Sequence, residues 1–202
     1  GFNSIQPLNQ QLYLFAQDYK KKDKEYVIYG AKINNATGDL VGDMQELCTF
    51  QLESKKDDLD FVIKPSEDST LWTVVGDITD DVSSRISVYV FDKNFIKKTS
   101  AVINMGFAPG SFDLESVTYT AGNKLLLLGR QYEVTETMVS KKKKTTRTFK
   151  KYVLTRYSNT GNKEGEIPLD AGEKYMLSGR LITQNSGDIY LAGFYCNTSK
   201  RD

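Results

Sequence analysis

Five side chains stand where they could bind a ligand, because each follows a short apolar run by one to three residues. They are Tyr19, Asp77, Arg130, Tyr132 and Tyr195. Tyrosine rings stack on sugars or anchor a protein partner, and charged groups fix the polar parts of a ligand. We therefore expect these residues to form a binding face for a glycan or a protein. The alternative is that the tyrosines pack between sheets.

A second candidate surface is the basic segment 140–151, SKKKKTTRTFKK. Its charged residues include Lys141, Lys142, Lys143, Lys144 and Arg147. Alternating polar and apolar residues on both sides of it predict two strands that extend as a long hairpin. A basic tip would attract an anionic lipid, a polysaccharide or an acidic protein patch. Alternatively, its lysines are solvated charges that prevent pairing with another strand.

An acidic turn, GDITDD, contains Asp77, Asp80 and Asp81. A Ca²⁺ ion takes several carboxylate oxygens, so this cluster could hold one, but the spacing of an EF-hand is missing. The corresponding turns elsewhere in the chain are not acidic. We therefore expect a surface turn here and no metal site.

The stretch 65–72, PSEDSTLW, resembles the Asp-box of sialidase propellers at Ser66 and Asp68. It lacks the glycine of that motif, and Trp72 comes one residue early. Because the spacing fails, we expect Trp72 to be a core residue.

The chain has no histidine. A Ser-His-Asp triad, a Cys-His pair and a histidine metal site are therefore excluded. Catalysis would have to use carboxylates, Lys, Tyr or Ser, and paired acids could cleave a glycosidic bond. Asp18 and Asp77 are acids that could face a central channel, but the sequence gives no way to pair its acids in space. We expect a protein that is not an enzyme and holds no cofactor, with a carboxylate-dependent glycosidase as the alternative. Cys48 and Cys196 lie far apart in the sequence. We expect either two buried thiols or one disulfide.

The bulk composition restricts the partners. Lys and Arg number 27 and Asp and Glu 26, so the net charge of +1 argues against nucleic acid. No apolar run reaches the roughly 18–20 residues of a transmembrane helix. With 39% hydrophobic and 26% charged residues, the 202-residue chain has the composition of a globular protein.

A repeat becomes visible when the chain is aligned on a small residue that ends each apolar run. These anchor residues are Ala16, Gly76, Gly129 and Gly193. Two positions before them stand Leu14, Val74, Leu127 and Leu191. Turn-forming residues precede the last three runs, at 65–70, 120–124 and 184–188. Further short strands before and after each run predict a unit of four strands.

Repeated four-stranded antiparallel units are typical of a β-propeller, whose blades cover one another's faces. We expect an all-β fold with one propeller-like domain over residues 1–202. Its units are 1–58, 59–110, 111–172 and 173–202, about three and a half blades because the last has only two strands. This predicts either a part of a longer propeller or a ring closed by a second copy. A β-sandwich is the alternative fold.

Two long segments, 9–47 and 178–202, resemble large secreted or envelope proteins of the Bacteroidetes that carry propeller-like repeats. The resemblance implies an exported protein, in the periplasm or associated with the cell envelope or outer membrane. It transfers no catalytic residue. Together with the missing catalytic pattern, it favours a binding or scaffolding module with a protein or glycan partner.

Overall fold

The computed structural model of the chain is built from antiparallel β-strands. It describes residues 1–54, 57–80, 84–139, 142–169, 175–184 and 188–197, with the backbone alone at 58, 139, 142–144, 175 and 183. No helix occurs within these ranges. An all-β protein is therefore confirmed, and the described residues contain nothing long and apolar enough to cross a membrane as a helix.

The strands form four sheets that follow one another along the chain. The first sheet contains β1 (Phe2–Leu8), β2 (Gln11–Lys20), β3 (Glu25–Ile33) and β4 (Leu40–Gln51). The second contains β5 (Asp58–Pro65), β6 (Leu71–Thr79), β7 (Ser84–Asp92) and β8 (Lys97–Asn104). The third contains β9 (Phe112–Tyr119), β10 (Lys124–Val139), β11 (Lys142–Ser158) and β12 (Lys163–Leu169). The fourth is the hairpin of β13 (Tyr175–Thr183) and β14 (Ile189–Cys196).

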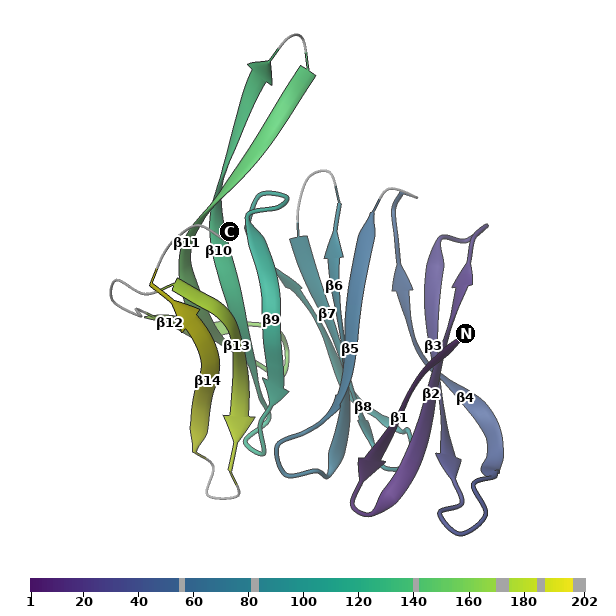
Figure 1. The fold of residues 1–202 in the computed structure, drawn as a ribbon. Helices are drawn as coiled ribbons and strands as arrows, with labels where there is room; N and C mark the ends of the chain where they lie inside the picture. The colour runs from purple at the N-terminus through teal and green to yellow at the C-terminus, as the bar shows by residue number, and fades with distance from the viewer. Residues whose placement is uncertain (55–56, 81–83, 140–141, 170–174, 185–187, 198–202) are drawn as a thin grey trace.

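Each of the first three sheets pairs its strands in chain order, so the repeated four-stranded antiparallel unit is confirmed. The sheets stand side by side, with the first at one end and the hairpin β13–β14 at the other (Figure 1). The start of the chain, which has a weak strand pattern, does form a first strand: β1 pairs with β2 from Phe2 to Leu8.

The sheets are held together because alternate residues of each second strand point to opposite neighbours. Before Gly76, Val74 packs towards the first sheet and Val75 towards the third. Before Gly129, Leu127 packs towards the second sheet and Leu128 towards the fourth. Consecutive apolar residues are thus needed because both faces of these strands are covered.

Aromatic rings fill the interface between the first and second sheets. Trp72 is completely buried, with its ring centroid 5.1 Å from that of Tyr13 and 4.9 Å from that of Phe15. Both contacts are edge-to-face, a favoured geometry for aromatic pairs. The prediction that Trp72 is a core residue is confirmed.

The anchor glycines are required by close packing. A Cβ built on Gly76 would lie 2.4 Å from the ring of Phe50, on the neighbouring sheet. One built on Gly129 would lie 2.0 Å from the ring of Phe112, on the neighbouring strand. At both of these positions the obstacle is an aromatic side chain.

Tyrosine hydroxyls join neighbouring sheets. Tyr13 donates to the carbonyl of Lys93 at 3.0 Å, and Tyr89 donates back to that of Thr49 at 3.0 Å. Between the third and fourth sheets, Tyr152 donates to the carbonyl of Met176 at 3.2 Å. Each ring therefore fills apolar space while its hydroxyl remains hydrogen-bonded.

The predicted long hairpin is formed by β10 and β11, which pair from Lys124 and Ser158 to Val139 and Lys142. Their neighbours are shorter, since β9 pairs with β10 only as far as Gln131. The outer half of the hairpin consequently projects beyond the other sheets (Figure 1).

Replacing Gly76 by alanine should lower the free energy of unfolding by about 1–3 kcal/mol, because the new methyl group would overlap the Phe50 ring. The matched control is Gly165→Ala, where an added Cβ meets no atom within 4 Å. Urea unfolding measures both. Equal stabilities of the two variants would contradict the packing role of Gly76.

Candidate functional site

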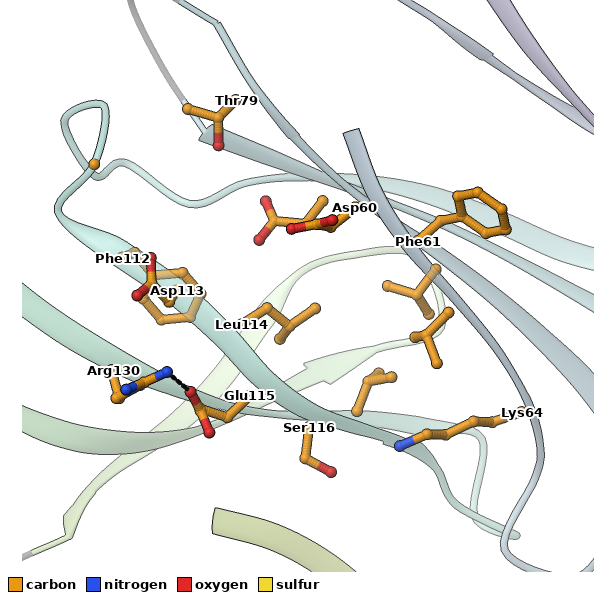
Figure 2. A pocket seen from close by; sticks show the side chains of 15 residues that line it. Asp60, Phe61, Lys64, Thr79, Phe112, Asp113, Leu114, Glu115, Ser116 and Arg130 are labelled. Carbon is orange, nitrogen blue, oxygen red and sulfur yellow. Dashed lines mark ion pairs between the residues drawn. The ribbon is translucent and has the colours of Figure 1, made fainter. Parts of the chain in front are cut away.

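A cavity of about 530 Å³ lies between the second and third sheets (Figure 2). Residues of β5 and β6 form one wall, and residues of β9 and Arg130 of β10 form the other. The volume is within the range of small-ligand sites. The described residues therefore contain a cavity large enough for a small molecule.

The wall contributed by β5 follows from the two-residue period of a strand. Asp60, Val62 and Lys64 alternate with Phe61 and Ile63, so their side chains lie on one face. This face lines the cavity, while Ile63 belongs to the core shared with the first sheet. One strand thus supplies an acid, an apolar group and a base in sequence.

Two carboxylates stand next to each other at one end of the cavity. Asp60 of β5 is the direct cross-strand partner of Asp77 of β6. Side chains of such partners have Cβ atoms about 5 Å apart, and like charges placed there repel. Two acidic side chains are therefore close together at this end of the cavity.

A partly buried ion pair forms part of the opposite wall. The guanidinium of Arg130 contacts the carboxylate of Glu115, with side-chain exposures of 22% and 11% (Figure 2). Burial by itself would lower the pKa of Arg130, but Glu115 in particular raises it above its usual value. In the described part of the chain, Nε of Arg130 is buried without a hydrogen-bond partner. The pair holds β10 against β9.

Asp113 links the cavity to the base of the long hairpin. Its carboxylate accepts a hydrogen bond from Arg147 at 2.6 Å, and Arg147 lies 4.0 Å from the ring centre of Tyr132. Burial raises the pKa of the Tyr132 hydroxyl, as does its hydrogen bond to Asp113. Charge in this corner is therefore largely neutralised within the protein.

Lys64 is the basic group at the other end of the cavity. Burial lowers its pKa, and the positive charge of Arg180 on β13 lowers it further. Within the described ranges, no carboxylate forms an ion pair with Lys64. The hydroxyl of Ser116 lies on the same side of the cavity (Figure 2).

The predicted binding residues separate into two groups. Asp77 and Arg130 line the cavity, and Tyr132 lies beside it through Asp113. Tyr19 instead stacks on Tyr26 of the first sheet, with ring centres 4.6 Å apart. Tyr195 is exposed on β14 of the fourth sheet. The five residues therefore do not form one continuous face.

Several cavity residues were not predicted. Asp60 and Lys64 lie on β5, and Asp113 and Glu115 lie on β9. The prediction considered loops after the anchor residues, whereas these side chains come from the first strand of a unit. In the apolar stretch DFVIK, the charged residues Asp60 and Lys64 are four positions apart and therefore on the same face of the strand. This spacing was the signal that both ends of that face are polar.

The basic segment is only partly described. Arg147 points to Asp113, and Lys150 and Lys151 are near Glu133 and Glu166, at 3.6 and 3.7 Å. Lys141 lies outside the described residues, and Lys142, Lys143 and Lys144 are described by their backbone in β11. A binding role for these four lysines stays a prediction.

The acidic turn and the cysteines have ordinary surroundings. Asp80 pairs with Arg85 at 3.4 Å, while Asp81 is outside the described residues. No metal-binding group of three or more acids or cysteines is found among the side chains that the structure describes. Neither Cys48 nor Cys196 is in a disulfide, and burial raises the pKa of Cys48 to about 12. Its thiol is therefore protonated and a poor nucleophile.

Comparison with protein-family models, curated proteins and solved structures finds no match for this chain. The resemblance to Bacteroidetes envelope proteins therefore stays a prediction.

Glu115→Gln should lower the free energy of unfolding by about 2 kcal/mol, because it leaves the largely buried guanidinium of Arg130 without its counter-charge. The control is Glu133→Gln, whose pair with Lys150 is exposed on both sides and should contribute at most about 0.5 kcal/mol. Urea unfolding of both variants compares the two pairs. A Glu115→Gln protein as stable as the control would contradict a structural role for this pair.

Proposed function

We propose that the protein is a non-catalytic binding module that takes its ligand in the cavity between the second and third sheets. The observation that carries this proposal is the cavity itself, which combines about 530 Å³ with charged groups at its walls. An interface that served packing alone would be filled by apolar side chains at native density. Each sheet interface has an apolar core, and beside the core between the second and third sheets a space remains open.

The walls suit a ligand with both polar and apolar parts. Val62, Val75 and Leu114 provide apolar surface, while Asp60 and Lys64 provide charge. Binding sites commonly combine a mostly apolar lining with a few polar groups that fix the ligand's orientation. A protein segment or a glycan fits this description.

A carboxylate-dependent glycosidase is the second candidate. It is favoured by the cross-strand position of Asp60 and Asp77, which brings two acids together in one cavity. Retaining glycosidases use two carboxyl groups about 5 Å apart. Asp18, the other acid considered from the sequence, is exposed on the first sheet and does not line the cavity.

We further propose that the four sheets are successive blades of a β-propeller in an exported protein. The alternation of covered faces supports the propeller, because it continues at both ends of the stack. Leu14 and Ile5 of the first sheet correspond to Leu127 and Val117 of the third sheet, which pack against the second sheet. The equivalent face of the first sheet is open, because Ile5 is 52% exposed. At the other end, Tyr190 of β14 is 50% exposed. A second copy would cover both faces.

The ligand proposal can be tested on arrays of glycans and short peptides. The wild-type protein should bind a defined set, and Leu114→Trp should lose it because the larger side chain fills the cavity. Ile167→Trp, on an exposed position of β12, is the control that should still bind. Binding that survives Leu114→Trp in a folded protein would place the ligand elsewhere. Release of reducing sugar from a bound glycan would instead support the glycosidase.

Ring closure by a second copy predicts a solution mass of twice the 22.8-kDa chain. Phe194→Arg should shift the mass to that of a single chain, because Phe194 is 76% exposed on β14 and would lie in the new interface. Light scattering after size-exclusion chromatography measures this. A wild-type mass of 22.8 kDa at every concentration would exclude closure by a second copy.

A further inference from the structure

We infer that the cavity binds a short extended peptide as a zwitterion, with its α-amino group at Asp60 and Asp77 and its carboxylate at Lys64. This inference rests on the proposed binding function and names the chemical class of the ligand. It is carried by the order of groups on the face of β5 that lines the cavity: Asp60 at one end, Val62 in the middle and Lys64 at the other (Figure 2).

The spacing of the charged ends matches a peptide of three or four residues. Asp60 and Lys64 are four residues apart on one face of β5, which corresponds to about 13 Å along a strand. An extended peptide rises about 3.3 Å per residue, so its termini are separated by a similar distance at this length. A single amino acid is too short to reach both ends.

The acidic end has the properties of a site for an ammonium group. Asp60 and Asp77 are direct cross-strand partners, and two negative charges so placed attract a cation between them. Asp60 has no ion-pair partner among the residues that the structure describes. An α-amino group carries three N–H donors, enough to bond both carboxylates.

The basic end has the properties of a site for a carboxylate. Lys64 is half-buried and has a second positive charge, that of Arg180, in its neighbourhood. The nearby Ser116 hydroxyl accepts a hydrogen bond from the backbone N–H of Leu181 at 3.3 Å, so its own proton can be donated. A bound carboxylate would offset the repulsion between these two positive charges.

The middle of the cavity accepts the apolar part of the peptide. Val62 and Val75 come from the second sheet, and Leu114 and Val117 come from the third. The other charged wall residues do not compete for the termini, because Arg130 is paired with Glu115 and Asp113 with Arg147. The cavity volume of about 530 Å³ is sufficient for a tripeptide.

Isothermal titration of the full chain with Ala-Leu-Ala tests the inference. The free peptide should bind about 10-fold more tightly than either its N-acetylated or its C-amidated form, because each cap removes one charge-assisted hydrogen-bonded group. A neutral trisaccharide, maltotriose, is the comparison ligand. Equal affinity for free and capped peptides would overturn recognition of the termini.

Two variants assign each terminus to its end of the cavity. In Asp60→Asn the preference for the free amino group should fall about 10-fold while the preference for the free carboxylate remains, and in Lys64→Gln the reverse should hold. Asp43→Asn on β4 and Lys93→Gln, both exposed and distant from the cavity, should behave as the wild type. Thermal unfolding shows that each variant is folded.

The outcomes separate the inference from the proposed function. If no peptide binds but the arrays give another ligand that Leu114→Trp abolishes, the cavity is a binding site and the peptide inference is wrong. If neither peptides nor arrays give a ligand that depends on the cavity, both are wrong. Peptide binding that neither Asp60→Asn nor Lys64→Gln changes also overturns the inference.

Discussion

The structure depends on the mutual covering of sheet faces. A four-stranded sheet of this length cannot hide both of its faces by itself, so the residues before each anchor alternate between one neighbour and the next. Tyr13 and Phe15 of the first sheet meet Trp72 and Val74 of the second, and among the described residues this interface buries most of the largest side chains. Burial of apolar surface of this kind is the dominant favourable term in folding.

The cavity is the place where this covering is interrupted. Val75 and Val117 still meet across the second interface, but the residues further along the same strand faces are Asp60, Asp77 and Glu115. Charged groups cannot replace an apolar core without partners. Glu115 therefore pairs with Arg130, and the remaining polar wall surrounds open space. Packing on both sides of this gap keeps its walls in fixed positions.

Much of the fold could be predicted from the sequence because the repeat is marked by residue patterns that extend over only a few positions. Leu14, Val74, Leu127 and Leu191 do occupy equivalent places, each in the second strand of its sheet and two residues before the anchor. The turns and the long hairpin follow from residue types that act over a few positions. Such local signals require no knowledge of how the sheets are arranged in space.

The candidate site could not be predicted to the same extent. Asp77 and Arg130 were found because they follow anchor residues, but Tyr19 and Tyr195 satisfy the same rule and lie on other sheets. Which residues share a cavity depends on how β5 and β9 are placed on either side of it, and these strands are separated by about fifty residues of chain. The alternation of residues within either strand does not predict which other strand lies opposite it. Glu115 lies at a bulge in β9, and this bulge is visible only in the way that β9 pairs with β10.

The fourth sheet has a consequence for how the protein opens. It shares one interface, through Leu181 and Met176, whereas the second and third sheets are each held on two sides. In an array of modules, stability is the sum of intrinsic and nearest-neighbour contributions, so a sheet covered on one face is less protected than a sheet covered on both. In a single chain, whose fourth sheet no second copy covers, backbone amides of β13 and β14 will therefore exchange with solvent deuterium before those of β6. Since the backbone N–H of Leu181 donates to the hydroxyl of Ser116, fraying of this hairpin also breaks a hydrogen bond to a residue of the cavity wall.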